Sequence, residues 1–482
     1  MIPERFQPIL RELAPLTELF RGGGFRLYLV GGTVRDLLAG ELDEAVDFDA
    51  TTDARPEDIK RLLTGWADAV WPQGEKFGTI AAKKRGPTGE RSYEITTHRA
   101  EAYQPESRKP DVEFSDLIEA DLSRRDFTIN AMALELTSPS PTLVDPFGGA
   151  ADLVTRTLRT PLGPEQSFSD DPLRMLRAAR FIARLGAKPE TGLADAVSAM
   201  RGRLSIVSAE RIRDELDKII TLPHPGAGLW FAIDTGLAEE FLPELPAMRL
   251  EQDPIHHHKD VLTHTLAVVD NVRPPSEAAS WPDGTPPQFD FRRTRLAALF
   301  HDVGKPRTRG YLKGKGVTFH HHDAVGAKMT RRRMDALRYS SADIQAVTEL
   351  VALHLRFHTY SLGWTDSAVR RYVRDAGPLL SELNVLTRAD CTTRNPKKAE
   401  MLAKRMDDLE ARVAELAERE ELAAIRPELD GTAVMEQLGL VPGPEVGRAL
   451  AFLLEVRLEE GLLGEEIVRQ RLDNWWQNHY AP

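Results

Sequence analysis

The sequence has few of the features that mark secreted or membrane proteins. Its 482 residues contain a single cysteine, Cys391, which excludes an internal disulfide framework and fits a reducing compartment. No apolar run approaches the length of a membrane span, and the residues from Met1 to Arg5 show no signal-peptide pattern. We therefore expect a cytoplasmic protein with no membrane partner.

Positive charge is also not in excess. The formal net charge is -11, which argues against a protein coated in positive charge. A nucleic-acid partner stays possible, because contact with phosphates needs only a local basic stripe. With 41% hydrophobic, 28% charged and 7% aromatic residues the composition is that of a globular protein, and the length predicts roughly three domains.

The order of predicted elements gives an α+β fold class. Short apolar strands alternate with helices up to about residue 150, and helical periodicity dominates after about residue 152. The expected strands are Leu27–Val30, Val46–Asp49, Ala69–Trp71, Thr79–Ala82 and Tyr93–Thr96. Helix starts are expected at Ser169 and Ser208. Pro274–Pro287 is rich in loop formers, and the apolar stripe from Leu402 to Leu416 favours packing within the chain over a short coiled coil.

A double glycine follows the first expected strand. Gly31 and Gly32 turn the chain into a helix, with Thr33 and Asp36 at the spacing of a capping box. The start of such a helix offers free N–H groups and the positive end of a dipole to a phosphate. Taken alone, a Gly-Gly pair is more often only a turn.

Two aspartates lie fifteen and seventeen residues after Gly32. Strand alternation places Asp47 and Asp49 on one face and Phe48 in the core. Adjacent carboxylates repel unless a cation lies between them, and paired Mg²⁺ ions of a phosphoryl-transfer site need such ligands. The alternative is a solvated strand edge. Glu94 on a later strand is a candidate third ligand.

Several further segments occur in a distinctive order. Residues 121–133 place charged residues before an apolar stretch that we expect to be helical, and they are followed by Asp145–Gly149 and by Asp170–Phe181. Together with the Gly-Gly turn and the Asp-x-Asp strand, they resemble the bacterial-type (class II) tRNA nucleotidyltransferases of the poly(A) polymerase superfamily. The layout is similar to the HD-bearing actinobacterial members.

The resemblance implies a polymerase-β-like nucleotidyltransferase head followed by all-α neck, HD and tail regions. The expected boundaries are 1–150, 151–248, 249–372 and 373–482. The implied partners are tRNA, CTP and ATP, with Mg²⁺ on Asp47 and Asp49. Residues implied in nucleotide binding are Gly31, Gly32, Arg35, Arg125, Asp126, Asn130, Asp171, Arg174, Arg177 and Arg180, of which Asp171 and Arg174 select the base.

Helical spacing supports the second half of this set. A step of three residues keeps Asp171, Arg174, Arg177 and Arg180 on one drifting face, and Leu173, Leu176 and Phe181 are expected on the opposite side. The alternative is a helix surface covered by salt bridges. The family's usual Glu-Asp opening is Asp170-Asp171 in this chain.

A second site is predicted in the helical half. Its residues end apolar helix faces with polar groups, which need a partner such as a shared metal. They resemble the HD phosphohydrolase ligands, and they are His264, His301, Asp302, His322, His354 and Asp390. The run His320-His321-His322 leaves the choice of ligand open. The resemblance implies a divalent metal, which can be a transition metal, and hydrolysis of phosphoesters. The alternative is an inactive, structural site.

The segment 99–111 resembles the family's flexible loop that is needed to change from CTP to ATP, which favours complete CCA addition. A poly(A) polymerase with the same head, an HD phosphohydrolase and an RNA-binding protein with decayed sites remain alternatives. The oligomeric state is left open by the sequence.

Overall fold

The structure is a computed structural model that divides into two units, Met1–Pro243 and Glu244–Pro482, which are described separately. For residues 100–104 and 107–113 it describes the backbone alone. The described residues are 3–41, 47–73, 78–86, 89–104, 107–250, 260–277, 287–312, 316–359, 363–392, 395–420, 422 and 425–480.

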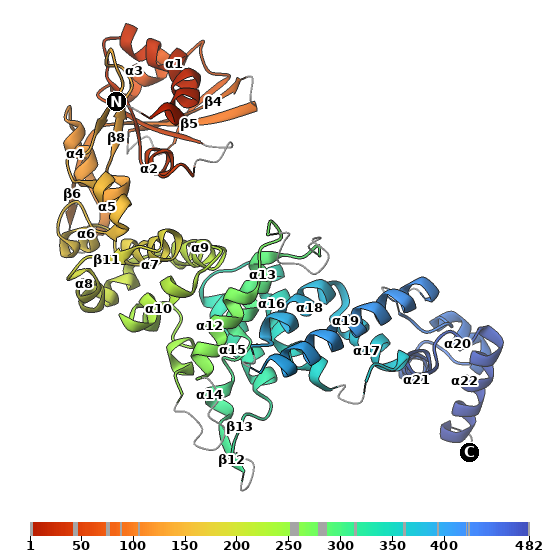
Figure 1. Ribbon diagram of the computed structural model, residues 1–482. Coiled ribbons are helices and arrows are strands. Elements are labelled where there is room, and N and C mark those ends of the chain that lie inside the picture. The colour runs from red at the N-terminus through yellow and green to blue at the C-terminus, as the bar shows by residue number, and fades with distance from the viewer. Residues whose placement is uncertain are drawn as a thin grey trace. The chain divides into compact units, whose positions relative to one another are not determined.

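A seven-stranded mixed sheet forms the centre of the first unit (Figure 1). The strand order is β3-β4-β5-β2-β1-β8-β9, in which β2 and β5 are parallel and the other neighbours are antiparallel. The strands are β1 (Leu27–Val30), β2 (Phe48–Thr52), β3 (Ala69–Pro72), β4 (Thr79–Gly86), β5 (Gly89–Thr97), β8 (Ala133–Glu135) and β9 (Thr142–Val144).

Strand β1 is apolar throughout because both of its faces are buried. Leu27 and Leu29 point into a core that includes residues of α1 (Gln7–Gly22), α2 (Gly32–Ala39) and α3 (Pro56–Leu63). Tyr28 and Val30 point to the opposite face, where residues of α4 (Ile118–Ser123) cover the sheet. Burial on two sides removes the polar alternation that a half-exposed strand would show.

Helices make up most of the remaining first unit. Helix α7 packs against α9 and α10, and this packing positions its polar residues. The helices are α5 (Gly149–Thr155), α6 (Pro164–Asp170), α7 (Leu173–Leu185), α8 (Leu193–Met200), α9 (Ala209–Ile220), α10 (Gly226–Asp234) and α11 (Leu237–Phe241). Short strands β10 (Thr157–Leu158) and β11 (Lys188–Pro189) pair in parallel.

In the described residues of the second unit, the secondary structure is helical apart from the antiparallel strands β12 (Gly310–Leu312) and β13 (Gly316–Thr318). Its first helices are α12 (Val261–Asn271), α13 (Phe291–Phe300), α14 (Lys305–Thr308), α15 (His322–Ala336), α16 (Ser341–Leu353), α17 (Asp366–Ala376) and α18 (Leu380–Asp390). The last are α19 (Pro396–Arg419), α20 (Gly431–Leu438), α21 (Pro444–Glu460) and α22 (Glu465–Tyr480). The described part of the chain also contains 3₁₀ helices at Glu4–Phe6, Thr128–Asn130, Arg201–Ile206, Pro246–Met248, Arg356–Thr359 and Gly377–Leu379.

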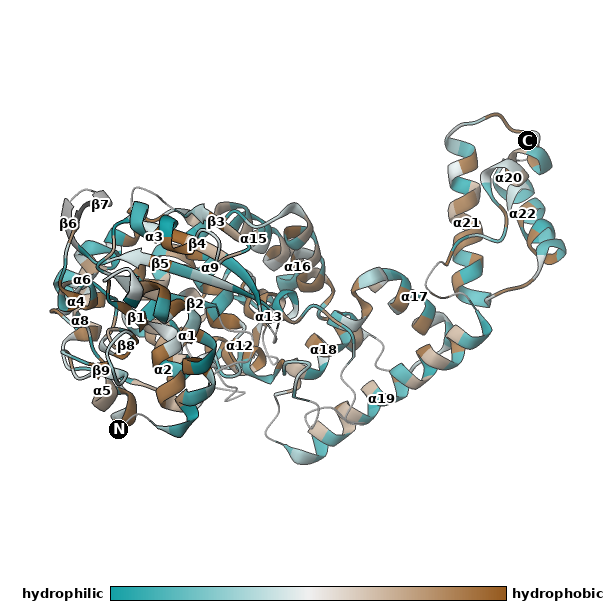
Figure 2. Cartoon of the chain, turned by 90° about the horizontal axis from the view of Figure 1, so that it is seen from above, coloured by the Kyte–Doolittle hydropathy of each residue, from teal (hydrophilic) through white to brown (hydrophobic). Residues whose placement is uncertain are grey.

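A buried charge cluster joins α17, the end of α19 and α21. Glu420 accepts hydrogen bonds from Arg370 at 2.8 and 3.1 Å and from Arg457 at 2.6 Å. Helix α19 is banded in polar and apolar residues (Figure 2), and its buried Met406, Leu409 and Leu416 belong to the predicted stripe. Since α19 packs against α17 and α18, the structure agrees with the prediction of packing within the chain.

Some of the predicted elements differ in the structure. Residues 127–133, which we expected to be helical, form only a 3₁₀ turn at Thr128–Asn130 before β8. In the predicted loop region, β6 (Arg99–Gln104) and β7 (Ser107–Phe114) pair as antiparallel strands. In the predicted loop Pro274–Pro287, residues 278–286 lie outside the described residues. Where the chain is described, no helix has both the length and the apolar character needed to cross a membrane.

Candidate functional site

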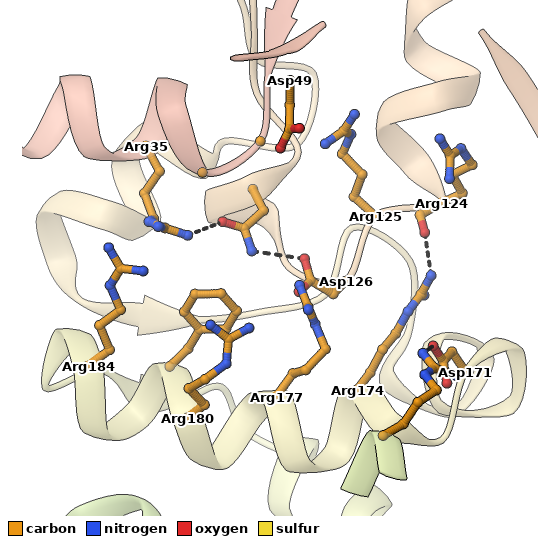
Figure 3. A pocket seen from close by; sticks show the side chains of 15 residues that line it. Arg35, Asp49, Arg124, Arg125, Asp126, Asp171, Arg174, Arg177, Arg180 and Arg184 are labelled. Atoms are coloured by element: carbon orange, nitrogen blue, oxygen red, sulfur yellow. Dashed lines mark hydrogen bonds and ion pairs between the residues drawn. The ribbon is translucent and has the colours of Figure 1, made fainter. Parts of the chain in front are cut away.

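An open, positively charged cavity of about 450 Å³ lies in the first unit (Figure 3). Its volume falls within the usual range for pockets that bind small molecules and cofactors. Eight arginines line it against three aspartates, so it is suited to an anion. The lining residues are Gly31, Gly32, Arg35, Asp49, Arg124, Arg125, Asp126, Asn130, Asp171, Arg174, Arg177, Arg180, Phe181, Arg184 and Arg211.

The double glycine forms one wall of the cavity. Gly31 has φ 73° and ψ -137°, and a Cβ there would lie 3.1 Å from an Nη of Arg125, so a side chain is disfavoured twice. Helix α2 begins at Gly32 as predicted, but the expected capping box does not form. Asp36 instead accepts hydrogen bonds from Arg35 at 2.8 and 2.9 Å, because that arginine offers a charged fork.

The three predicted carboxylates lie at one end of the β2–β5 pair. Asp49 lines the cavity and is in register with Glu94, while Asp47 is exposed just before β2. Glu94 accepts a hydrogen bond from Gln73 at 2.7 Å. Partial removal from water, together with the charges of Glu94 and Asp47, raises the pKa of Asp49 against the opposing effect of Arg125. A cation at this place would relieve that repulsion.

Asp126 is the buried carboxylate that links the two walls of the cavity. It accepts a hydrogen bond from Arg177 at 2.8 Å and from Asn130 at 2.9 Å, and Asn130 accepts one from Arg35 at 2.6 Å. Although burial disfavours its charged form, Arg177 and Asn130 lower the pKa of Asp126 to about 2. The hydrogen bonds therefore run from α7 to α2 through a permanently ionised group.

Helix α7 contributes a row of four arginines, Arg174, Arg177, Arg180 and Arg184, which point toward the sheet side of the cavity in Figure 3. The predicted face is confirmed for the first three. The predicted helix start at Ser169 is wrong, because α6 continues to Asp170 and α7 begins at Leu173. Asp171 therefore lies in an extended break between two helices.

Phe181 was expected on the opposite side of α7, and this prediction is wrong. It lines the cavity, and the guanidinium carbons of Arg35 and Arg180 lie 5.2 and 4.6 Å from its ring centroid. Phe181 follows Arg174 by one heptad, after which a helix returns to nearly the same side, so Phe181 lies near Arg177 and Arg180. An aromatic face stabilises cations that would otherwise repel one another.

Sequence reasoning missed five residues of this site. Arg124, Arg184 and Arg211 line the cavity, while Asp121 and Glu215 lie behind it and bind its arginines. Asp121 is fully buried and binds Arg124 and Arg125, and Glu215 binds Arg180 at 2.8 Å. The i+10 position of Arg184 relative to Arg174 was a signal for Arg184, and the i,i+3 and i,i+4 spacing within residues 121–125 was a signal for Asp121 and Arg124. Arg211 and Glu215 had none, because their contacts join separate helices.

The second predicted site is brought together in full. Two groups of three side chains, His264–His301–Asp390 and Asp302–His322–His354, each place their ligand atoms within 4.8 Å of one another. One oxygen of Asp302 lies 3.2 Å from His301 Nε2 and the other lies 3.4 Å from His322 Nε2, so Asp302 faces both groups. The choice of His322 among three consecutive histidines agrees with this geometry.

Backbone contacts orient the histidines of this cluster. The Nδ1 atoms of His301, His322 and His354 donate to the carbonyls of the residues three positions earlier, at 2.8, 2.7 and 2.6 Å. A carbonyl only accepts, so Nδ1 carries the proton and the Nε2 lone pair of the neutral ring points inward. His322 and His354 bring these Nε2 atoms to 3.2 Å, which requires a proton or a metal ion between them.

The surroundings of the HD pair support a cation site. Lys305 donates to Asp302 at 2.6 Å, and His301, Lys305 and the hydrogen bonds hold the pKa of the buried Asp302 well below its usual range. Gly304 allows the backbone beside the HD pair to approach the start of α15 closely, because a Cβ there would lie 2.1 Å from the carbonyl oxygen of His322. Burial lowers the pKa of His354 to about 4, so this ring is neutral near pH 7, the form that a metal ion would need.

Three family models match the chain. The Poly A polymerase head domain matches residues 27–159, the model described as probable RNA and SrmB-binding site of polymerase A matches residues 188–248, and the HD domain matches residues 261–422. The HD match thus includes all six residues of the second site.

Known proteins and solved structures resemble the chain over most of its length. The A-adding tRNA nucleotidyltransferase of Deinococcus radiodurans is 33% identical over 445 residues, which cover 89% of this chain and 91% of that protein. The CCA-adding enzyme of Geobacillus stearothermophilus is 34% identical over 67% of this chain and 70% of its own length. The Bacillus stearothermophilus CCA-adding enzyme in complex with CTP has a TM-score of 0.65 at 22% identity, covering 99% and 98% of the two chains, and therefore shares the fold.

The Asp126–Arg177 pair gives a testable pH dependence. Asp126→Asn should weaken the local stability of α7 by about 2 kcal/mol at pH 7, because the folded pKa is depressed. A depressed pKa stabilises the fold above the ordinary value of about 4 and loses this contribution as the pH falls through about 2. Hydrogen exchange of residues 173–185 at pH 7 and at low pH measures the effect. A difference from wild type that does not shrink in acid would contradict this account.

Proposed function

The chain belongs to the bacterial-type tRNA nucleotidyltransferase family, and we propose that it adds C, C and A in turn to the 3′ end of tRNA from CTP and ATP, with release of pyrophosphate. The observation that carries this proposal is the cavity, in which Asp49, a carboxylate suited to binding a metal ion, faces a row of arginines. A nucleotide suits this cavity, because the arginines can bind its triphosphate while a metal ion on Asp49 binds the phosphate oxygens.

We propose four parts, with boundaries at 1–150 for the head, 151–248 for the neck, 249–372 for the HD region and 373–482 for the tail. The matched family ranges support the first two boundaries within about ten residues. The HD match continues to residue 422, and Asp390 contacts His264, so the last boundary is the least supported.

The head carries the transfer chemistry in this proposal. Asp47 and Asp49 would hold Mg²⁺, and Glu94 lies beside them as the third carboxylate. Bound Mg²⁺ would stabilise charge on the attacking and leaving oxygens. Gly31, Gly32 and Arg35 would bind the triphosphate, and Arg125, Asp126 and Asn130 would position its remaining phosphates and the ribose. The arginines on α7 neutralise the phosphates without rearrangement, because the protein already holds them in place.

Base selection is assigned to Asp171 and Arg174. A carboxylate accepts from the exocyclic amino group of cytosine or adenine, and a guanidinium donates to the adjacent ring acceptor. Uracil and guanine place a carbonyl where the carboxylate needs a donor, a mismatch of about 1 to 3 kcal/mol. Arg174 is well restrained for this role, since it donates to Ser167 Oγ at 3.0 Å and to the carbonyl of Arg124.

The products on three RNA substrates test the proposed activity. A tRNA transcript ending at the discriminator base, or one or two cytidines beyond it, should be completed to CCA in every case when CTP and ATP are supplied together. An A-adding enzyme, as the Deinococcus relative is named, would extend only the transcript that already ends in CC. A poly(A) polymerase would add long A tracts, and either product would overturn the proposal.

Asp47→Asn and Asp49→Asn should each lower nucleotide addition by at least about 100-fold, because an amide replaces a charged Mg²⁺ ligand of the same size. Single-turnover rates at saturating CTP and Mg²⁺ measure this loss. Glu90→Gln is a matched control, because Glu90 lies on β5, pairs with Lys83 at 2.7 Å and is exposed away from the cavity. Retention of more than a tenth of the wild-type rate by either aspartate variant would exclude the metal-binding assignment.

For the HD cluster we propose a divalent-metal centre, including a transition metal, that hydrolyses phosphoesters such as 2′,3′-cyclic phosphates. The inward Nε2 atoms and the two groups of three ligands favour one ion in each group. Four imidazoles and two carboxylates suit Zn²⁺, Ni²⁺, Co²⁺ or Mn²⁺ better than Mg²⁺ alone. A bound ion of this kind would supply a water-derived nucleophile near pH 7.

His301→Ala combined with Asp302→Ala should remove bound metal and any cyclic-phosphate hydrolysis while nucleotide addition continues, because the two sites lie in different units. Metal content by mass spectrometry, hydrolysis with each of four divalent ions, and CCA addition are measured on the same preparations. His320→Ala is the matched control, since His320 is exposed and outside both ligand groups. A wild-type protein that binds metal but hydrolyses nothing would show a structural site.

A further inference from the structure

Asp171 has little support from its own helices. It lies between α6 and α7 with φ -140° and ψ 104°, so no helical turn fixes its side chain. Its Oδ1 accepts the backbone N–H of Leu173 at 3.1 Å, which is the local hydrogen bond that starts α7. A single contact to one oxygen leaves the second oxygen of a carboxylate to be oriented by something else.

That second contact comes from a helix forty residues later in the chain. Arg211 donates from Nη2 to Asp171 Oδ2 at 2.8 Å, and both residues line the cavity. Their side chains are 40% and 22% exposed, so the ion pair lies at the mouth of the cavity, where a nucleotide can reach it. Because its two oxygens have different fixed partners, the plane of the Asp171 carboxylate is defined before a nucleotide arrives.

Helix α9 contacts the cavity-lining residues at the start of α7 and on it at two points. Arg211 lies in its first turn, and Glu215 lies one turn later on the same face. Glu215 is buried and accepts a hydrogen bond from Arg180 at 2.8 Å. Helix α9 therefore provides an arginine that binds Asp171 and a glutamate that binds Arg180. The packing of α9 against α7 keeps both contacts in place.

The partner residue Arg174 is held differently. Its guanidinium is bound by Ser167 and by the carbonyl of Arg124, and neither α9 nor Asp171 is among these partners. Arg174 is buried, whereas Asp171 reaches solvent. The two base-selecting side chains are therefore restrained by independent contacts, and Arg211 acts on only one of them.

We propose that Arg211 is a positioning residue that sets base selectivity through Asp171, an inference that rests on the proposed base-selecting role of Asp171. A carboxylate rejects a carbonyl only if it cannot turn away from it. Arg211 prevents that turn, and it leaves lone pairs of Asp171 available, since a carboxylate has about four acceptor positions. Without Arg211, the Asp171 carboxylate can rotate away from a base that presents a carbonyl, so this base is rejected less strongly.

Arg211→Ala should therefore reduce the preference for CTP over UTP by about tenfold, because one charge-assisted hydrogen bond that orients Asp171 is lost. KM for CTP should rise more than kcat falls, since the metal site is unchanged. Arg211→Lys should restore selectivity in part, because lysine keeps the charge but lacks the planar fork. Arg213→Ala is the control: Arg213 lies on the same helix, pairs with Asp214 at 2.8 Å and does not line the cavity.

A double-mutant cycle distinguishes the outcomes. CTP, UTP, ATP and GTP incorporation is measured for Asp171→Ala, Arg211→Ala and the pair, at matched folded fraction by thermal melting. If Arg211 acts through Asp171, the double variant should have the selectivity of Asp171→Ala alone. Additive losses would show that Arg211 contacts the nucleotide directly and would overturn the inference.

The same measurements separate this inference from the proposed function. If Asp171→Ala changes base preference and Arg211→Ala does not, Arg211 has no positioning role while Asp171 still selects the base. If neither variant changes base preference, the base-selecting role of Asp171 itself fails, and the inference fails with it. Selectivity losses equal in Arg211→Ala and Arg213→Ala would indicate a general effect of α9 and would also overturn it.

Discussion

Repulsion among cations is the constraint on which the architecture of the first unit depends. Eight arginines face one cavity, and without compensation their mutual repulsion would open it. Compensation comes from acids that bind these arginines: Asp126, which lines the cavity, binds Arg177, while Asp121 binds Arg124 and Arg125 and Glu215 binds Arg180 from behind it. Buried carboxylates cost free energy to desolvate, so each is stable only with its cation present.

This arrangement explains why positive charge remains available to a ligand. Each acid accepts hydrogen bonds from the side of a guanidinium that faces the protein. Because a guanidinium has five N–H donors, some of them remain available to a ligand. Burial lowers neither the charge of the arginines nor that of Asp126, whose pKa is about 2. The cavity therefore keeps a fixed excess of positive charge over the pH range of a cell, and an anion entering it needs little reorganisation of the protein.

The second site follows the opposite logic. Its carboxylates and inward imidazole nitrogens are electron-rich, and the Nε2 atoms of His322 and His354, whose Nδ1 atoms both donate to carbonyls, lie 3.2 Å apart. Only a cation or added protons relieve that contact, so this cluster lacks part of its charge balance within the protein. The first site is nearly balanced by its own acids and attracts an anion with the remainder, whereas the second depends on an external positive charge for its ligand geometry.

Residues that follow one periodic element were predictable from the sequence. Asp47, Phe48 and Asp49 follow strand alternation, and Arg174, Arg177 and Arg180 follow helical spacing. The six HD-type ligands were identified as a set by their resemblance to a family pattern. Arg211 and Glu215 were not predictable, because their partners lie on another helix and no local rule fixes that pairing. The prediction of a helix start at Ser169 was wrong because Asp171 and Pro172 separate α6 from α7. A residue that precedes proline avoids helical geometry.

If Asp171 and Arg174 select the base, as proposed, their chemistry also limits which bases these two side chains can distinguish. Cytosine and adenine both present an amino group beside a ring acceptor, so an acceptor–donor pair accepts either and rejects uracil and guanine. Under the proposed function, the hydrogen bonds of these two side chains cannot by themselves produce the change from C to A, whereas a purine and a pyrimidine differ in the space that they fill in the cavity. Under the proposed function, the growing RNA end would alter the free volume beside Asp171 while its hydrogen-bonding partners stay the same. A carboxylate fixed by Leu173 and Arg211 is suited to this task, because its geometry remains constant while the space in front of it changes.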